Sequence, residues 1–239
     1  MMRADSRAHD ELRPVTILTG FQRYAEGSVL IEFGDTRVLC SASVEDSVPP
    51  FRKGTGSGWI TAEYSLLPRS TLVRGSRESS RGKVGGRTHE IQRVIGRCLR
   101  SIANLDAFGE RTVWIDCDVI QADGGTRSAA ITGGYVALAL AVRRLREAGL
   151  IADDPLLSQV AAVSVGVVDR EVMLDLVYSE DFVADVDFNV AMTGDGRYVE
   201  IQGNAEGAPF GRERLNEMLS LAGVGIEQLL EYQQQALEK

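Results

Sequence analysis

Residues 111–148 read RTVWIDCDVIQADGGTRSAAITGGYVALALAVRRLREA, and this stretch decides the fold. Residues 111–122 alternate well enough for a strand, and the alanine-rich run from about Ser128 to Ala148 is long enough for a helix. Gly124 and Gly125 separate the two, so the strand passes through a glycine turn directly into the helix. A helix start exposes N–H groups and a positive dipole end, and with the side chains of Thr126 and Arg127 it suits a phosphate. A tight turn with Thr126 as a simple helix cap explains the same residues.

Strands and helices are expected on both sides of this unit. Meanders of strands interrupted by helices predict an α+β fold with a mixed or antiparallel sheet. The length of 239 residues fits one domain, 1–239, in which we expect 1–12 to be a mobile N-terminus and 68–86 an exposed basic loop. The predicted elements are strands at 15–19, 29–33, 37–44, 59–67, 160–168, 172–177, 181–193 and 198–202, a helix capped by Thr88, and two short helices after Gly211.

Composition excludes several classes of protein. No apolar run approaches the roughly 20 residues of a membrane span, and residues 1–12 lack the pattern of a secretory signal, so we expect a cytoplasmic protein without a membrane partner. Cys40, Cys98 and Cys117 each lie among apolar residues, which predicts reduced core cysteines. With only His9 and His89 available, a paired-histidine ribonuclease or a Ser-His-Asp triad is disfavoured.

The charge of the chain is unevenly distributed. The formal net charge is -8, which ordinarily argues against nucleic acid as a partner. Residues 69–100 nevertheless contain eight arginines and Lys83 against Glu78 and Glu90, so this segment alone is strongly positive. Arginine is suited to bidentate contact with phosphate, so the segment predicts a surface for a polyanion such as RNA, with a solvated charge run as the alternative. On the helix after Thr88, the side chains of Arg93, Arg97 and Arg100 are expected to form one basic stripe.

A second glycine–arginine–hydroxyl junction precedes that helix. Gly85, Gly86, Arg87 and Thr88 repeat the residue types of the turn at 124–127. The two junctions can therefore converge on a single phosphate, or they can be two unrelated helix caps.

Carboxylates gather near residue 185. In an extended segment Asp181, Asp185 and Asp187 share one face, and such a set can hold a divalent cation at a phosphoryl-transfer site. An acidic turn followed by a strand edge explains the same pattern. Asp116 and Asp118 also share a face, and the sequence assigns them no role.

Taken in order, several blocks resemble the bacterial ribonuclease PH family. The likeness covers nearly the whole chain, and its departures are Asn204 in place of threonine and the run 128–130 in place of Thr-Ala-Ser. The blocks are Gly58–Tyr64, Pro68–Thr71, Gly85–Arg93, Asp116–Val119, Gln121–Arg127, Asp175–Leu176, Glu180–Asp181, Asp187–Asn189 and Val199–Gly203.

The resemblance implies a phosphorolytic 3′-to-5′ exoribonuclease that trims tRNA precursors and releases nucleoside diphosphates, in a β-α-β-α type of α+β fold. It further implies a homohexamer built as three dimers. By the same likeness the attacking inorganic phosphate is bound by Arg87, Gly125, Thr126 and Arg127, a divalent metal such as Mg²⁺ by Asp181 and Asp187, and tRNA by Arg69, Arg74, Arg77 and Arg93. The catalytic set is then Asp181, Asp187 and Arg127.

Two rival functions remain open from the sequence. The first is a hydrolytic exonuclease in which Asp116, Asp118, Asp181 and Asp187 hold two cations and water is the nucleophile. The second is a non-catalytic RNA-binding ring subunit, which is disfavoured because the arginine and carboxylate sets are both intact.

Overall fold

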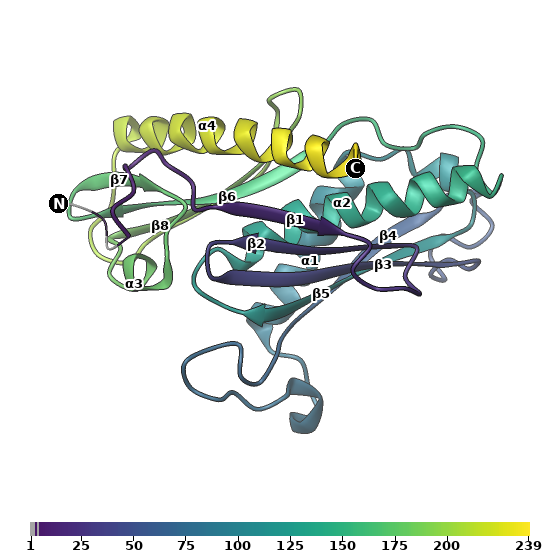
Figure 1. The fold of residues 1–239 in the computed structure, drawn as a ribbon, viewed down its shortest axis with the longest axis horizontal. Coiled ribbons are helices and arrows are strands. Elements are labelled where there is room, and N and C mark those ends of the chain that lie inside the picture. The colour runs from purple at the N-terminus through teal and green to yellow at the C-terminus, as the bar shows by residue number, and fades with distance from the viewer. Residues whose placement is uncertain (1–2, 4) are drawn as a thin grey trace.

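The computed structural model describes Arg3 and residues 5–239, apart from the side chain of Arg81. These residues form two β-sheets with helices packed against them (Figure 1). The α+β class is therefore confirmed, although the strands form two sheets where the sequence indicated one.

The first sheet is mixed. Its order is β1-β2-β3-β5-β4, in which neighbours are antiparallel except for the parallel pair of β4 and β5. Cys40 on β3 lies opposite Cys117 on β5, and both are buried free cysteines, as is Cys98. The bounds are β1 Val15–Thr19, β2 Gly27–Phe33, β3 Thr36–Glu45, β4 Trp59–Leu66 and β5 Thr112–Gln121.

The second sheet is antiparallel, in the order β7-β6-β8-β9. Strand β6 is buried along its whole length, because helices α2 and α4 both pack on it. The bounds are β6 Val160–Val168, β7 Glu171–Leu174, β8 Val186–Thr193 and β9 Tyr198–Ala205.

The helices join the two sheets into one core. Helix α2 packs against β2 and β3 of the first sheet and against β6 of the second, while α1 packs on β4. The buried apolar residues of both sheets belong to one continuous cluster, beside a small cluster around Met173 and Leu176. The helices are α1 Gly86–Ser101, α2 Thr126–Glu147, α3 Tyr178–Asp181 and α4 Arg212–Leu237, with short 3₁₀ helices at Glu78–Arg81 and Leu105–Phe108.

Three local predictions differ from the structure. Residues after Gly211 form the single long helix α4, not two short ones. Asp181 ends helix α3, and the strand begins only at Val186, so Asp181 is not part of an extended segment. Helix α1 has Gly85 at its N-cap, whereas the Thr88 hydroxyl lies inside the helix and donates to Glu78 Oε1 at 2.9 Å.

The N-terminal segment packs against the second sheet, in contrast to the mobile terminus expected at 1–12. Arg3 is 4% exposed and donates to both carboxylate oxygens of Glu180, at 2.9 and 2.7 Å. Arg7 donates to the backbone oxygen of Asp175 at 3.0 Å. Met1, Met2 and Ala4 lie outside the described residues. These contacts join the segment to the residues that precede and form α3.

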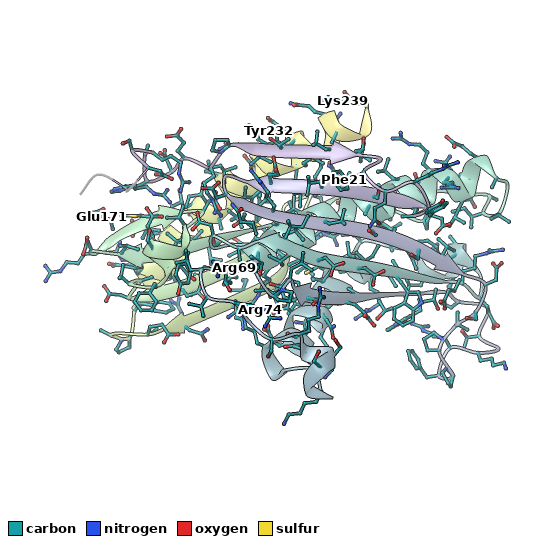
Figure 2. The ribbon with its side chains drawn as sticks, turned by 60° about the horizontal axis from the view of Figure 1, so that its bottom comes forward. Phe21, Arg69, Arg74, Glu171, Tyr232 and Lys239 are labelled. Atoms are coloured by element: carbon teal, nitrogen blue, oxygen red, sulfur yellow. The ribbon has the colours of Figure 1, made fainter. Side chains whose placement is uncertain are left out.

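Residues 68–86 form an arm that hangs below the sheets in Figure 1. Most of its side chains are exposed, as expected for a basic loop, although Ser70 is buried. Figure 2 shows Arg69 and Arg74 near the middle of the face turned to the viewer, well away from Tyr232 of α4 and from Lys239 beyond the end of that helix. Across the part of the chain that the structure describes, no helix is both long and apolar enough to cross a membrane.

Candidate active site

The two predicted glycine junctions meet at one cavity of about 350 Å³. The start of α1 contributes Arg87, and the junction of β5 with α2 contributes the run 124–127. Carboxylates of α3 and β8 complete the wall, with Asp181 on the helix and Asp187 on the strand. The structure thus brings together the residues predicted for phosphate and for metal. Its other lining residues are Tyr64, Leu66, Thr71, Ala122, Ser164, Tyr178 and Asn189.

The glycine turn before α2 requires its two glycines. Gly124 and Gly125 have φ of 75° and 67°, in the left-handed region that favours glycine. A Cβ at Gly124 would lie 2.4 Å from the Leu176 carbonyl oxygen, so no larger residue fits there without a shift. Because the chain turns this tightly, the first N–H groups of α2 are presented at the cavity together with Arg127.

The turn is held from behind by a buried ion pair. Arg13 donates from Nη2 to Asp175 Oδ1 at 2.6 Å and from Nη1 to the Asp123 carbonyl oxygen at 2.6 Å. The Thr36 hydroxyl donates to the Gly124 carbonyl oxygen at 2.6 Å. Side chains of Arg13 and Asp175 are 3% and 2% exposed, so this network is closed to solvent. Asp123 and Asp175 belong to the family-like blocks, but no local pattern indicated this network, because its residues lie far apart along the chain.

Arg127 is already oriented at the start of α2. It donates from Nη2 to Glu90 Oε2 at 3.0 Å, which ties the start of α2 to the fifth residue of α1. The hydroxyls of Thr126 and Tyr64 are hydrogen-bonded to each other at 2.8 Å. Thr126 therefore does not cap the helix through its side chain, and the N-cap is Gly125. Tyr64 lies on β4 in the block Gly58–Tyr64, so the sequence singled out its strand but gave it no role.

Arginines and carboxylates face one another across the cavity. Desolvation raises the pKa of Asp181, and the nearby charge of Asp187 raises it further, while Arg87 and Arg127 lower it. Desolvation also raises the pKa of Asp187, against the lowering effect of Arg127 and of the hydrogen bond from Asn189. The Asn189 side chain donates from Nδ2 to Asp187 Oδ1 at 3.0 Å. The sequence could have predicted that Asn189 lies beside Asp187, since the two residues are separated by the two-residue period of a strand.

Two carboxylates are available to a cation in this cavity. Asp185 lies between α3 and β8 and does not line the cavity, which corrects the expectation of three aspartates on one face. Within the described residues, no group of three or more His, Cys, Asp or Glu side chains is arranged to hold a metal ion. A pair of carboxylates that desolvation makes costly to ionise fits Mg²⁺, which binds one or two carboxylates and takes its remaining ligands from water and substrate phosphates.

Asp116 and Asp118 lie elsewhere. They line a separate cavity with Glu63 on the first sheet, and Tyr64 is the residue that both cavities share. Desolvation raises the pKa of both aspartates. A four-carboxylate arrangement with Asp181 and Asp187 is therefore not formed, which removes the geometric basis of the two-cation hydrolytic rival.

The predicted RNA-binding arginines are exposed and do not line the cavity at the starts of α1 and α2. Arg69, Arg74 and Arg77 belong to the basic arm, and Arg93 lies on α1. The basic stripe expected on α1 is broken, because Arg97 pairs with Glu200 at 2.8 Å. Arg100 lies over the ring of Trp59, 4.4 Å from its centroid, and donates to the Ile60 carbonyl oxygen at 2.7 Å.

This fold and site define a class of RNA-degrading enzyme. The 3′ exoribonuclease family matches the chain twice, with its domain 1 over residues 11–143 and its domain 2 over residues 158–225. The chain belongs to this family.

The individual relatives narrow the class. Ribonuclease PH of Moorella thermoacetica is 61% identical over 237 residues, covering 99% of this chain and 95% of the relative. Ribonuclease PH of Bacillus subtilis is 58% identical over 238 residues, covering 99% of this chain and 97% of the relative. The resemblance to the ribonuclease PH family is thus confirmed, and with it the activity of a phosphate-dependent 3′ exoribonuclease and nucleotidyltransferase.

Solved structures agree on the fold. Rice (Oryza sativa) Rrp46 superposes with a TM-score of 0.79 at 20% identity, covering 98% of this chain and 100% of that one. A chain of the Archaeoglobus fulgidus exosome with RNA bound to the active site gives a TM-score of 0.79 at 22% identity, covering 96% and 91%.

Proposed function

We propose that the cavity at the starts of α1 and α2 binds inorganic phosphate and directs it at the 3′-terminal phosphodiester of a tRNA precursor. Arg87, Gly125, Thr126 and Arg127 are the phosphate-binding residues in this proposal. The observation that carries it is the convergence of two helix starts and two arginines at one cavity, facing the carboxylates of Asp181 and Asp187. Such a site suits an attacking anion beside a leaving group whose charge must be neutralised.

The reaction is one in-line displacement. An oxygen of inorganic phosphate attacks the phosphorus of the last phosphodiester, the bond to the 3′ oxygen of the penultimate nucleotide breaks, and that oxygen takes up a proton. The terminal nucleotide departs as a nucleoside diphosphate, and the reverse reaction adds a nucleotide. Positioning and charge stabilisation supply most of the catalysis in phosphoryl transfer, so arginines and helix N–H groups suffice without a covalent nucleophile.

Asp181 and Asp187 are the proposed ligands of a divalent cation, with Mg²⁺ the ion that two carboxylates fit best. When bound, such an ion neutralises charge on the transferring phosphoryl group and on the leaving oxygen. Asn189 orients Asp187 by donating to its Oδ1. Arg127, Asp181 and Asp187 form the catalytic set of the proposal.

The basic arm, residues 68–86, is the proposed binding surface for tRNA. Arg69, Arg74 and Arg77 are exposed there, and Arg93 is exposed on α1, so all four are accessible to backbone phosphates. We further propose a cytoplasmic homohexamer of three dimers, in which the arms of neighbouring chains surround the path of the RNA. Residues 1–239 act as one unit in this proposal, because the cavity draws residues from both sheets.

Product identification tests the proposal. The protein is incubated with a single-stranded RNA in the presence and absence of phosphate, and the released nucleotides are separated by chromatography. Nucleoside diphosphates that form only with phosphate are expected. Monophosphates formed without phosphate would support the hydrolytic rival, and RNA binding without any release would support the non-catalytic one.

A further inference from the structure

The N-terminal segment reaches the short helix that carries Asp181. A tight turn, closed by the Ser6 N–H on the Arg3 carbonyl oxygen at 2.9 Å, lets Arg3 and Arg7 contact one stretch of chain, residues 174–180. His9 continues this contact, since its carbonyl oxygen accepts from the Leu174 N–H at 2.8 Å. In Figure 1 the purple N-terminal segment lies at the same end of the molecule as β7 and α3. The start of the chain therefore packs on the element that supplies one catalytic carboxylate.

Helix α3 has little apolar attachment to the core. Of residues 178–183, all of which the structure describes, only Glu180 is buried. Tyr178, Phe182 and Val183 are 51%, 77% and 61% exposed. A helix of four residues is not stabilised by its own backbone bonds, because nucleation costs more than so few bonds return. The position of α3 therefore depends on polar contacts.

The Glu180 carboxylate is the centre of those contacts. Its Oε1 accepts from Arg3 Nε at 2.9 Å, and its Oε2 accepts from Arg3 Nη2 at 2.7 Å. Oε2 also accepts from the N–H of Val177, the N-cap residue of α3, at 3.2 Å. The side chains of Arg3 and Glu180 are 0% and 8% exposed, so water does not take the place of either partner. A bidentate pair of this kind fixes geometry as well as charge.

The same guanidinium also holds the chain that precedes α3. Arg3 donates from Nη1 to the Leu174 carbonyl oxygen at 2.8 Å and from Nη2 to the Asp175 carbonyl oxygen at 3.0 Å. Asp175 has φ of 53°, a strained conformation for a residue other than glycine, which persists only where its surroundings hold it. Arg3 thus joins the end of β7, the strained residue after it and α3. Because Asp181 directly follows Glu180, the place of its carboxylate depends on this joint.

We propose that Arg3 and Glu180 are positioning residues for Asp181, and that the N-terminal segment thereby sets how tightly Asp181 and Asp187 bind a divalent cation. The inference rests on the proposed function, which makes these two aspartates the ligands of the cation. Each aspartate then has its own support, because Asn189 already donates to Asp187 Oδ1 at 3.0 Å. Residues that orient metal ligands change metal affinity or activity by about 10–100-fold.

The test is the binding of Mn²⁺, used as a probe for Mg²⁺, without RNA or phosphate. Electron paramagnetic resonance measures the free ion and so gives its Kd. Arg3→Met removes the guanidinium, and we expect the Kd for Mn²⁺ to rise about tenfold and kcat for phosphorolysis to fall by a similar factor. The KM for phosphate should not change, because Arg87 and Arg127 are untouched. Arg3→Lys keeps the charge without the bidentate geometry and should give intermediate values.

Arg7→Met is the matched control. Arg7 is a buried arginine of the same segment that contacts the Asp175 backbone and not Glu180. Its replacement should lower the free energy of unfolding in urea, as Arg3→Met does, and leave the Kd for Mn²⁺ unchanged. Arg3→Met combined with Glu180→Leu removes both charges, so it leaves no lone buried charge that could prevent folding. Its Kd should match that of Arg3→Met, because the two residues act as a unit.

An unchanged Kd in Arg3→Met and in the double variant overturns the proposal. An equal rise of Kd in Arg7→Met also overturns it, since that result would show a general effect of stability. Asp187→Asn separates these failures from a failure of the proposed function. If it abolishes Mn²⁺ binding while Arg3→Met does not affect it, the cation site stands and the positioning role is wrong. If the unaltered protein binds no Mn²⁺, the cation site and the positioning role are both refuted.

Discussion

Arg127 at the start of α2 forms an ion pair with Glu90, the fifth residue of α1, with Nη2 of the arginine 3.0 Å from Oε2 of the glutamate. The arginine side chain is 14% exposed and that of the glutamate is 39% exposed, and of the two only Arg127 lines the cavity. Because Arg127 has further N–H donors, it can keep this contact and still bind an anion. The pair orients the guanidinium before phosphate arrives.

Replacement of Arg127 tests its role in binding the attacking phosphate. We expect Arg127→Ala to lower phosphorolysis by at least about 10²-fold, as the loss of a charge-stabilising donor does elsewhere. Binding of tRNA should be unchanged, since the proposed role is confined to the phosphate. Rates at increasing phosphate and Kd for tRNA measure the two effects, and full activity at modest phosphate would exclude the role.

Glu90 offers a finer test of the same contact. Glu90→Ala removes the group that orients Arg127, and we expect the KM for phosphate to rise about fivefold, equivalent to roughly 1 kcal/mol. Glu90→Gln keeps an acceptor and removes a negative charge close to the phosphate, so its KM should not rise. An unchanged KM in Glu90→Ala would contradict the orienting role, and equal increases in both variants would show that a neutral acceptor does not hold Arg127 in place.

Acid should inactivate the enzyme through Asp181 and Asp187. Desolvation raises the pKa of both carboxylates above the ordinary value of 3.8, so each takes up a proton at a higher pH than an exposed aspartate. Activity is then lost as the pH falls through these raised values, and more Mg²⁺ should shift the loss to lower pH because cation and proton compete. Asp187→Asn should cost both activity and metal dependence. An acid limb that does not move with Mg²⁺ concentration would contradict this account.

Charge reversal on the basic arm should separate long from short substrates. Arg74→Glu combined with Arg77→Glu should weaken tRNA binding and flatten its dependence on salt, by about one unit of slope for each lost phosphate contact. Short oligonucleotides that do not reach the arm should be cleaved comparatively well. Equal losses on both substrates would argue against the arm as the grip on tRNA.

The buried pair behind the glycine turn should govern stability. Asp175→Asn leaves the Arg13 guanidinium buried without its carboxylate, and we expect the free energy of unfolding to fall by about 3–5 kcal/mol. Glu217→Gln, which breaks an exposed pair with Arg214, is the control and should change it by no more than about 0.5 kcal/mol. Urea denaturation measures both, and similar values for the two variants would contradict a structural role for the buried pair.

Local patterns predicted most strands and the two glycine junctions, because alternation and glycine turns depend on neighbouring residues. Local patterns do not predict contacts between residues that are far apart in the sequence. The sequence indicated a mobile terminus that includes Arg3 and Arg7. In the fold Arg3 contacts Glu180 and Arg7 contacts the Asp175 backbone, and both partners are far away in the sequence. The stripe on α1 failed for the same reason, since Glu200 on β9 pairs with Arg97.

The site also combines residues that local patterns predicted with residues that only the fold brings together. Arg87, Arg127 and the glycine turn were predicted from residue type, whereas Tyr64 and Tyr178 enter the cavity from elements that only the fold places there. Asp181 and Asp187 do line one cavity, but the local argument that grouped them was wrong, because Asp181 lies on a helix and not on the strand of Asp187.

The origin of the oxygen in the product tests the central claim most directly. The enzyme is given a single-stranded RNA and phosphate labelled with ¹⁸O on all its oxygens, in unlabelled water, and the released nucleotides are analysed by mass spectrometry. Phosphorolysis predicts nucleoside diphosphates that carry the whole labelled phosphate group. Unlabelled monophosphates, or monophosphates that take up label only when the water is labelled, would show that water is the nucleophile and contradict the account.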